Sequence, residues 1–368
     1  MAERGRIHGR RRARRAVGAA LAAAVLAAGC PGDGGEDADG QAGEQGGDEA
    51  VSEAAGRGAS GREASPSAGC DGPATVQADL AEATMRVSGA ERRYLVSAPA
   101  WDEGDEPLPL VVDLHGLAEG ADIHAEMTQL GPLGVEEGFV TLFPHGTGEP
   151  VSWNLTADAQ ANDDLAFVAA LLDRVEAERC VDTSRVYATG LSMGAMMSST
   201  VACTMADRFA AIAPVAGVVL PQPCEPARPV PVLAIHGTAD PILLFNGGVN
   251  AEVLDSALGG GAGSATTTTV AADLDGEGHP EAVRGWASLN GCDEAARDDR
   301  ISDEVIRRTY DCPDEAAVEF LIVEGGGHSW PSSEFSRSIE RIVGPTTFDI
   351  DASREVWDFL SRFRLPEP

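Results

Sequence analysis

The stretch RVYATGLSMGAMMSS, from Arg185 to Ser199, decides how the rest of the chain can be interpreted. Residues 186 to 189 alternate in the manner of a short strand, and residues 195 to 197 are typical of the start of a helix. The pattern G-x-S-x-G, centred on Ser192, lies between them. A sharp turn between a strand and a helix lifts a serine hydroxyl clear of the sheet edge, so the stretch predicts a nucleophile. Alone, the pattern also fits a small-residue turn with an incidental serine.

A serine hydroxyl is a poor nucleophile near pH 7 unless a base takes its proton, so a histidine and an orienting carboxylate are needed. Of the seven histidines, His328 follows the last strongly apolar segment and lies within GGGHSW, where glycines let a loop approach the serine. Asp240 comes directly after the apolar segment 232–235. The sequence therefore predicts Ser192 as nucleophile, His328 as base and Asp240 as orienting acid. Its competitor Asp182 precedes the serine and is more simply a turn residue.

The negative charge that develops on an attacked carbonyl needs two backbone N–H donors. We expect the first from Met193, which directly follows the serine. We expect the second from Leu117, in the loop that follows the apolar segment 108–114. His115 and Gly116 open that loop, and a simple strand-ending turn is the alternative interpretation of this pair.

Short apolar segments rich in β-branched residues alternate with helical patterns from Cys70 onward. The alternation predicts an α/β fold with a mostly parallel central sheet and helices on both faces. The clearest helix is expected from Asp163 to Glu178, where apolar residues recur behind an acidic start. A Gly- and Thr-rich run over residues 246–280 interrupts the alternation and is expected to be an inserted surface loop. The predicted strands are residues 93–98, 108–114, 139–143, 186–189, 210–215, 232–235 and 318–323.

Seven short motifs follow one another along the chain: His115-Gly116, Ser152-Trp153-Asn154, Asp163-Asp164, Gly190 to Gly194, His236 to Pro241, Asn290-Gly291-Cys292 and Gly326 to Pro331. Their order resembles that of the polyhydroxybutyrate depolymerase family of esterases, which is similar to bacterial feruloyl and acetylxylan esterases. The resemblance runs from about Cys70 to the C-terminus. It implies an α/β-hydrolase fold in which Ser192 is the nucleophile, Asp240 the orienting acid and His328 the base.

The resemblance implies a serine esterase that acts on hydroxyalkanoate oligomers, feruloyl esters or acetyl esters. Trp153 and Trp330 are candidates for lining the acyl or alcohol pocket, because aromatic faces offer a large apolar contact. Core packing is the equal alternative for each of them. No cofactor is expected, because hydrolysis through an acyl-enzyme needs none. Two other functions stay open, namely a surface-anchored binding protein on an inactive hydrolase scaffold and a lipase or peptidase.

Residues 1 to 30 predict an export signal. Seven arginines lie between residues 4 and 15, and the apolar run that follows is too short to span a membrane. The run ends at Cys30 and resembles a bacterial lipobox, in which the cysteine is lipidated, although leucine stands one position earlier than is usual. An ordinary signal peptide and a twin-arginine signal are the alternatives. We expect an exported protein, lipid-anchored to the outer face of the bacterial cell membrane or otherwise extracellular.

Residues 31 to 69 predict a flexible acidic linker, and residues 70 to 368 the catalytic domain. The linker has nine acidic residues, two arginines and no aromatic residue, so it cannot bury enough apolar surface to offset its ordering entropy. The whole chain has a net charge of −32, and such a surface repels nucleic acid and anionic lipid headgroups. We therefore expect an ester substrate as partner, no nucleic acid, and membrane association through the lipid anchor only. The sequence leaves the oligomeric state open.

Six cysteines remain once the lipobox cysteine is set aside, and an even number in an exported protein predicts disulfides. Six cysteines allow about 15 pairings. The pairs that spacing favours, followed by the pair left over, are Cys203 with Cys224, Cys292 with Cys312, and Cys70 with Cys180. The sequence has no C-x-x-C and no Cys/His cluster typical of zinc, so no metal site is predicted.

Overall fold

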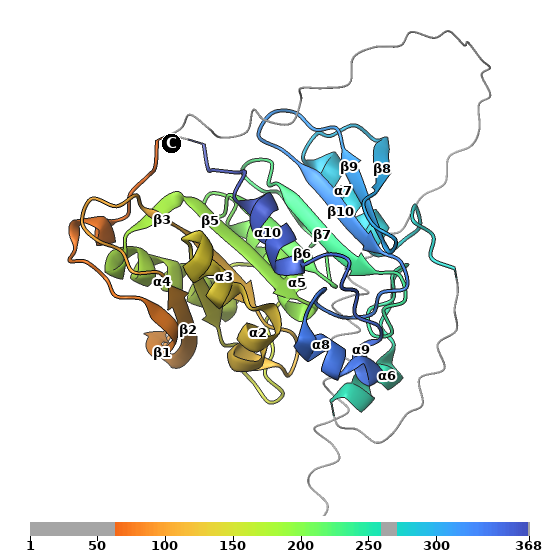
Figure 1. Ribbon diagram of the computed structural model, residues 1–368, viewed down its shortest axis with the longest axis horizontal. Coiled ribbons are helices and arrows are strands. Elements are labelled where there is room, and N and C mark those ends of the chain that lie inside the picture. The colour runs from red at the N-terminus through yellow and green to blue at the C-terminus, as the bar shows by residue number, and fades with distance from the viewer. Residues whose placement is uncertain (1–62, 259–270, 367–368) are drawn as a thin grey trace, which may run out of the picture.

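The computed structural model describes residues 63–258 and 271–366, and within them one ten-stranded sheet crosses the molecule (Figure 1). The strand order is β1-β2-β4-β3-β5-β6-β7-β10-β9-β8, which contains the exchange of β3 and β4 that is typical of an α/β-hydrolase. The expected export signal, Cys30 and residues 31 to 62 of the expected linker lie outside the described residues. The strands are β1 (Ala78–Val87), β2 (Ala90–Ala98), β3 (Leu108–Leu114), β4 (Val140–Pro144), β5 (Val181–Leu191), β6 (Ala211–Val215), β7 (Val232–Gly237), β8 (Ala296–Arg300), β9 (Val305–Tyr310) and β10 (Val318–Val323).

The centre of the sheet is parallel and its two sides are antiparallel. Strands β4, β3, β5, β6, β7 and β10 pair in parallel, whereas β1, β2, β8 and β9 join by antiparallel pairing. The strands β4, β6, β7 and β10 are buried along their whole length, as expected for apolar strands covered on both faces. The predicted parallel sheet is thus confirmed at its centre. Strands β1, β8 and β9 were not predicted. Exposed charged residues break the apolar pattern of β1 and β8, and two arginines, Arg307 and Arg308, interrupt that of β9 although the strand is largely buried.

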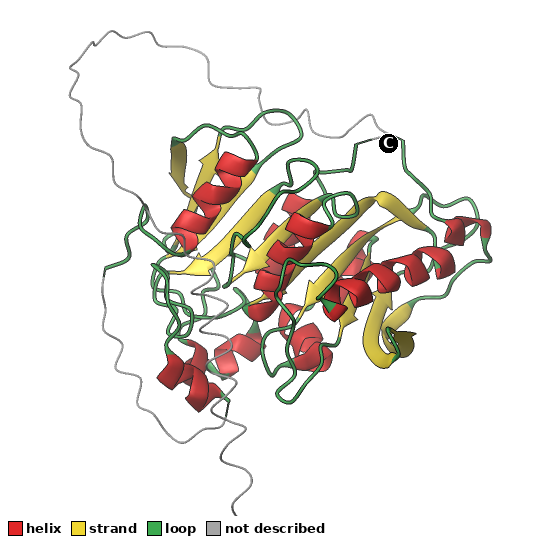
Figure 2. Cartoon of the chain, turned by 180° about the vertical axis from the view of Figure 1, so that it is seen from behind, coloured by secondary structure: helices red, strands yellow, loops and turns green. Residues whose placement is uncertain are grey.

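Helices cover both faces of the sheet (Figure 2). One apolar core lies between the sheet and α4, α5, α6 and α7, and a second lies between the sheet and α2, α3 and α10. Neighbouring side chains of β3 alternate between the two, so that Val112 belongs to the first core and Val111 to the second. The helices are η1 (Ala68–Asp71), α2 (Gly120–Thr128), α3 (Leu130–Glu137), α4 (Asp163–Glu178), α5 (Met193–Thr204), α6 (Ala251–Ala257), α7 (His279–Leu289), α8 (Glu334–Ser338), α9 (Glu340–Val343) and α10 (Ala352–Leu360).

Helix α4 begins and ends where the sequence predicts, at Asp163 and Glu178. The side chain of Asn162 caps it by accepting hydrogen bonds from the N–H groups of Asp164 and Leu165. The two aspartates of the first turn lie at the positive end of the helix, where negative charge is favourable. The apolar side of α4 packs against the sheet. The cap and the buried face therefore both support the helix that the sequence predicts.

Three disulfides connect the described chain, and their pairing is the one that spacing favours. The longest covalent loop ties the first helical turn, η1, to the residue that precedes β5 across 110 residues. The other two close loops of 21 and 20 residues. A cross-link that closes a long loop removes more conformational entropy from the unfolded chain. The three bonds are Cys70–Cys180, Cys203–Cys224 and Cys292–Cys312.

Contacts with the domain begin before Cys70, the boundary that the sequence suggests. The N–H of Ser65 donates to Oδ1 of Asp182 at 3.0 Å, at the start of β5. The other oxygen of this buried carboxylate accepts from Arg185 at 2.6 Å and from Arg364 at 2.7 Å. Asp182 thus holds both ends of the described chain at the amino end of β5. Asp182 therefore has a structural role, but within β5 and not in the preceding turn that the sequence suggested.

The segment over residues 246–280 is more structured than the surface loop that the sequence predicts. Its described residues include α6, in which Val253 and Leu254 are buried. The side-chain amide of Asn246 donates to the carbonyl of Asp273 at 2.7 Å and accepts from its N–H at 2.8 Å. Residues on either side of the undescribed part are therefore bound to each other.

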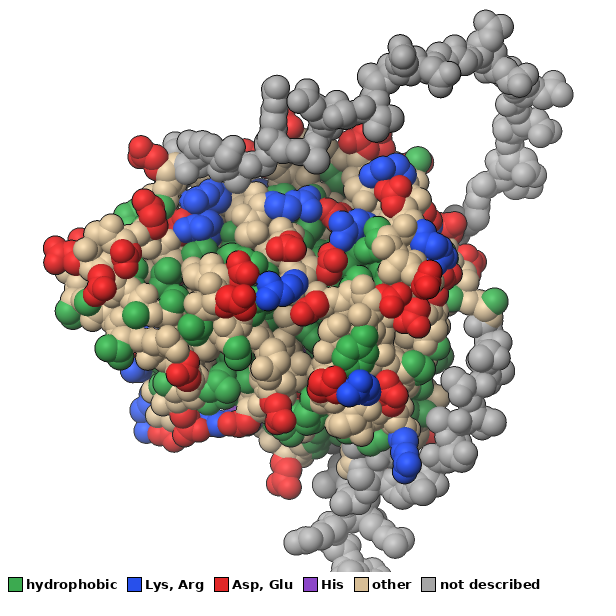
Figure 3. All heavy atoms as spheres, viewed as in Figure 1, with side chains coloured by type: hydrophobic (Ala, Val, Ile, Leu, Met, Phe, Trp, Pro, Cys, Tyr) green, Lys and Arg blue, Asp and Glu red, His purple; other side chains and the backbone are tan. Residues whose placement is uncertain are grey.

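Acidic side chains are spread over the face of the molecule shown in Figure 3, with fewer arginines between them. Several arginines of the described chain form ion pairs, such as Arg93 with Glu82 and Asp122, and Arg300 with Glu324. No helix in residues 63–258 and 271–366 is long and apolar enough to cross a membrane. The surface agrees with the acidic composition of the chain.

Candidate active site

Ser192 occupies the sharp turn between β5 and α5. Its φ of 58° and ψ of −118° are values that residues with a side chain rarely adopt, at a cost of about 1–3 kcal/mol. The surrounding backbone holds this conformation, because the N–H of Ser192 donates to the carbonyl of Val215 at 2.9 Å. Its own carbonyl accepts from the N–H of Met196 at 3.0 Å. The strand, turn and helix predicted around the serine are therefore present.

Two glycines allow the turn to sit against the end of β3. A Cβ on Gly194 would lie 1.8 Å from the carbonyl oxygen of Leu114, and a Cβ on Gly190 would lie 2.3 Å from the same oxygen. Contacts this short exclude any larger residue unless the backbone moves. The close approach brings Ser192 beside the loop that follows β3.

His328 and Asp240 form a hydrogen bond of 2.7 Å between Nδ1 and Oδ2. The other oxygen of Asp240 accepts from the N–H groups of Ile242 at 2.8 Å and Leu243 at 2.9 Å. Burial opposes ionisation of this carboxyl. The electrostatic interaction with His328 and the hydrogen bonds from His236 and His328 outweigh burial and hold the pKa of Asp240 well below its usual range. The carboxylate is therefore ionised and fixed from two sides.

The sheet brings the three predicted residues to one edge. Strands β5, β6, β7 and β10 are parallel neighbours, so their carboxyl ends meet at the same edge. Ser192 follows β5, Asp240 follows β7 and His328 follows β10. The Ser192 hydroxyl forms no hydrogen bond with any other described residue. Such bonds are often loose in an empty site and tighten when substrate binds.

The two expected oxyanion donors are placed on either side of this serine. Met193 is the first residue of α5, so its N–H lies at the positive end of that helix. The loop after β3 passes close by, because a Cβ on Gly116 would lie 3.5 Å from the Cβ of Ser192. In the described part of the chain, the N–H groups of Met193 and Leu117 donate to no other group. Both are thus free to bind an oxygen.

Trp153 and Trp330 are 3% and 1% exposed, which favours core packing over the pocket-lining role, the two alternatives that the sequence left open. The indole N–H of Trp153 donates to the carbonyl of His115 at 2.7 Å, and the two rings pack 4.6 Å apart. The indole N–H of Trp330 donates to the Ser353 hydroxyl at 3.0 Å. A groove of about 510 Å³ borders Trp330 where α2, α8 and α10 meet, but none of the three predicted catalytic residues lines it. Both tryptophans therefore serve packing.

Two further histidines, His236 and His279, lie next to Asp240. The rings of His236 and His279 are stacked with their centres 3.7 Å apart. Nε2 of His236 lies 3.3 Å from Oδ2 of Asp240 and 3.0 Å from the carbonyl of Leu243. Nδ1 of His279 lies 3.0 Å from the carbonyl oxygen of Val218, and burial lowers the pKa of His279 well below its ordinary value. Asp240 is thus supported by a histidine to which the sequence analysis gave no role.

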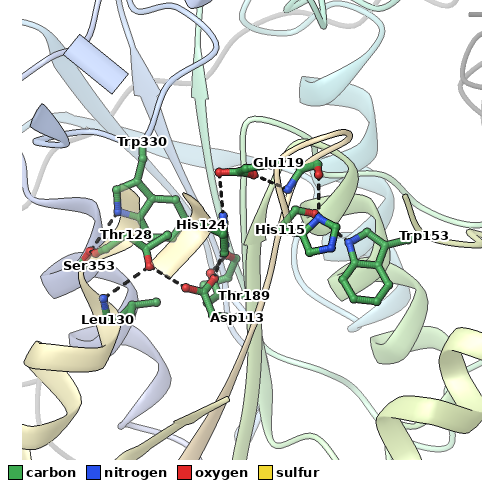
Figure 4. A network of polar contacts seen from close by, with 12 residues as sticks. Asp113, His115, Glu119, His124, Thr128, Leu130, Trp153, Thr189, Trp330 and Ser353 are labelled. Carbon is green, nitrogen blue, oxygen red and sulfur yellow. Dashed lines mark hydrogen bonds and ion pairs between the residues drawn. The ribbon is translucent and has the colours of Figure 1, made fainter. Parts of the chain in front are cut away.

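A network of buried charged groups lies beside the loop after β3 (Figure 4). Asp113, in β3, is bound by Nε2 of His124 and by the hydroxyl of Thr128, each at 2.7 Å. Nδ1 of His124 lies 3.2 Å from Oε1 of Glu119. Oε2 of Glu119 accepts from the N–H of Gly116 at 2.5 Å. The network therefore connects the sheet, α2 and the loop that carries an expected oxyanion donor.

The charges in this network depend on one another. Burial alone would lower the pKa of His124, but the carboxylates of Asp113 and Glu119 outweigh it and raise that pKa to about 10. Burial also opposes ionisation of Glu119, yet the charge of His124 and the hydrogen bonds from His124 and Gly116 hold its pKa below the usual range. His115 is different, because burial lowers its pKa to about 4. Near neutral pH, His124 is thus charged, Glu119 is ionised and His115 is neutral.

The chain is similar in sequence to known esterases. The family model described as esterase PHB depolymerase matches residues 94–262. NocK from Nocardia uniformis subsp. tsuyamanensis, which is named as an esterase, is 31% identical over 292 residues, covering 74% of this chain and 80% of NocK. The chain belongs to the polyhydroxybutyrate depolymerase family of esterases. The region matched to this family contains Ser192 and Asp240, and His328 follows it along the chain.

Other proteins are also similar to this member of the polyhydroxybutyrate depolymerase family. Feruloyl esterase B of Piromyces equi is 26% identical over 282 residues, which cover 75% of this chain and 46% of that protein. The chain thus spans about half the length of that relative. A solved structure, acetyl xylan esterase from Aspergillus awamori, aligns over 71% of this chain and 98% of its own, with 15% identity and a TM-score of 0.48.

Proposed function

We propose that this chain is a serine esterase that hydrolyses carboxylic esters through an acyl-enzyme at Ser192. The observation that carries the proposal is the 2.7 Å hydrogen bond between His328 and Asp240, at the edge where Ser192 stands on its turn. An imidazole whose Nδ1 proton is held by a carboxylate has Nε2 available to accept a proton. Membership in a family of esterases supports the same reaction.

In the proposed reaction, Nε2 of His328 takes the proton of the Ser192 hydroxyl while Oγ forms a bond to the carbonyl carbon of the ester. The N–H groups of Met193 and Leu117 stabilise the negatively charged oxygen. The bond to the alcohol oxygen then breaks, and His328 gives its proton to the departing alcohol. A water that His328 deprotonates attacks the acyl-enzyme, which releases the acid and restores the serine. Asp240 keeps His328 in the required tautomer throughout.

The proposed substrates are feruloyl esters, acetyl esters and hydroxyalkanoate oligomers. The first of these is taken from the name of feruloyl esterase B, and the last from the name of the family. We expect the purified protein to hydrolyse p-nitrophenyl acetate and at least one of methyl ferulate, acetylated xylan and hydroxybutyrate trimer. Release of acid is measured by titration, and the relative rates identify the preferred acyl group. If the protein hydrolyses none of the four compounds, the proposed function is wrong.

The proposed location is outside the cytoplasm, with a lipid anchor at Cys30. Three disulfides support export, because such bonds persist in oxidising compartments. We expect Cys30→Ser to move the protein from the membrane fraction to the medium or to block its maturation, because serine cannot form the thioether to the lipid. Fractionation followed by immunoblotting measures this. A Cys30→Ser protein that fractionates like the wild type would refute lipidation at this residue.

A further inference from the structure

Gly116 is held on both sides of its backbone. Its N–H donates to Oε2 of Glu119 at 2.5 Å, and its carbonyl oxygen lies 2.7 Å from Nδ1 of His115. Nε2 of His115 accepts from the N–H of Gly146 at 2.9 Å, so the ring proton is on Nδ1 and is donated to Gly116. The N–H of Glu119 donates to the same carbonyl at 3.3 Å. Both polar groups of Gly116 therefore have fixed partners.

These bonds determine the direction of the next N–H group. The carbonyl of Gly116 and the N–H of Leu117 belong to one planar peptide and point in opposite directions. A carbonyl fixed toward His115 therefore directs the N–H of Leu117 to the opposite side. Gly116 borders Ser192, and this N–H is the second proposed oxyanion donor. The direction of this N–H determines the geometry of its hydrogen bond to the negatively charged substrate oxygen.

We propose that Glu119 is a positioning residue for the oxyanion hole. Its carboxylate holds the N–H of Gly116, in the peptide that directly precedes Gly116–Leu117, and so fixes the backbone of Gly116 from which the N–H of Leu117 is directed toward the substrate oxygen. The inference rests on the proposed function, because an oxyanion donor matters only if an ester is attacked at Ser192. In the proposed reaction, Glu119 touches neither the substrate nor the reacting atoms. It acts through the backbone of Gly116.

The number of donors around Glu119 explains why an ionised carboxylate is needed. His124 is protonated on both nitrogens when charged, so its Nδ1–H is a donor, and the N–H of Gly116 is a second donor. A carboxylate accepts both, one on each oxygen. A glutamine at this position has one acceptor and one NH₂ group, so one of the two donors faces another donor as long as His124 stays charged through its contact with Asp113. Either the hydrogen bond that holds Gly116 or the one that holds His124 would then be lost.

The rest of the network gives His124 an anchor that does not depend on Glu119. Asp113 binds Nε2 of His124 at 2.7 Å and is itself bound by the hydroxyl of Thr128. The attachment of α2 to β3 therefore remains when Glu119 is changed. The loop after β3 has no such second carboxylate among the described residues. A change at Glu119 is expected to act on catalysis more than on folding.

The experiment compares Glu119→Gln with the wild type on p-nitrophenyl acetate, with rates expressed per serine labelled by an organophosphonate at completion. This normalisation excludes unfolded molecules. We expect kcat to fall roughly 10- to 100-fold with KM unchanged, since complete loss of one oxyanion donor costs roughly 10²- to 10³-fold. Affinity for phenylboronic acid, whose adduct places an oxygen in the same hole, is expected to fall by a similar factor. Glu126→Gln makes the same chemical change at an exposed position of α2 and is expected to behave like the wild type.

A second variant keeps the inference open to refutation if glutamine prevents folding. Glu119→Asp retains the charge beside His124 but shortens the side chain by one methylene, so it cannot reach Gly116 in the same way. We expect it to fold and to show the same loss of kcat and of boronate affinity. Wild-type kcat in a folded variant, or a change in melting temperature alone, would overturn the proposal, as would failure of both variants to fold. If the wild type neither hydrolyses esters nor reacts with the phosphonate, the proposed function itself has failed.

Discussion

Replacing Ser192 by alanine is expected to lower ester hydrolysis by roughly 10⁴-fold or more, because the variant has no oxygen with which to form the acyl-enzyme. Labelling by an organophosphonate is expected to disappear as well. The fold is expected to remain, since alanine removes one hydroxyl group that binds no other described residue. The strained turn is expected to remain, because the hydrogen bond from the N–H of Ser192 to the carbonyl of Val215 involves backbone atoms only, which alanine also has. Initial rates on p-nitrophenyl acetate and mass spectrometry after labelling measure the two effects.

A matched control lies six residues further along the chain, within α5. The Ser198 hydroxyl is buried and donates only to the carbonyl of Ala195, within its own helix, at 2.8 Å. Ser198→Ala makes the same chemical change close to the proposed nucleophile and is expected to keep both activity and labelling. Activity that survives in Ser192→Ala would show that another residue is the nucleophile. It would also remove the basis for the inference about Glu119.

Replacing Asp240 by asparagine is expected to lower kcat by roughly 10⁴-fold near neutral pH through the tautomer of His328. One oxygen at this position must accept from the N–H groups of Ile242 and Leu243. Asparagine keeps that contact by placing its carbonyl oxygen there, which turns its NH₂ group toward Nδ1 of His328. Nδ1 must then become an acceptor, so the ring proton moves to Nε2. An Nε2 that already carries a proton cannot take one from Ser192.

The measurement is kcat on p-nitrophenyl acetate together with the rate of phosphonate labelling, which is expected to fall in parallel. The melting temperature separates this effect from unfolding. Asp358→Asn, at an exposed position of α10, is the matched control and is expected to have wild-type kinetics. An Asp240→Asn variant with near wild-type kcat would mean that His328 is oriented by another group. His236, which approaches Asp240 but not Nδ1 of His328, could not supply that orientation.

Much of the fold could be predicted because the central strands carry their signal in their own residues. Strands that are covered on both faces are continuously apolar, and the helix from Asp163 to Glu178 shows both its cap and its periodicity. The edge strand β8 has the sequence ARDDR, which contains no apolar pattern. It forms because β9 offers it a partner, and a partner brought from elsewhere in the fold leaves no local signal.

The candidate site, like the fold, could be predicted only in part. Ser192, Asp240 and His328 each follow a recognisable strand, so their approach at one edge could be predicted. The role of the two tryptophans could not be decided from the sequence, because an indole ring is equally suited to a pocket and to a core that satisfies its N–H. Their burial favours the core.

The charged network had one signal that could have been used. Asp113 is a single carboxylate within the apolar segment LPLVVDL, and a buried charge requires a partner. Which histidine would be that partner depends on how α2 folds back over β3. Sequence spacing alone does not state this.

The position of Asp182 has a geometric consequence for anything attached upstream of Ser65. Strand β5 spans eleven residues, Val181–Leu191, so its two ends are roughly 30 Å apart at about 3.3 Å per residue. Ser65 binds at the first end, and Ser192 stands at the other. Anything attached upstream of Ser65 therefore joins the described chain at the edge of the sheet that is remote from Ser192. An attachment at that end therefore leaves the edge of the sheet that carries Ser192, Asp240 and His328 unobstructed.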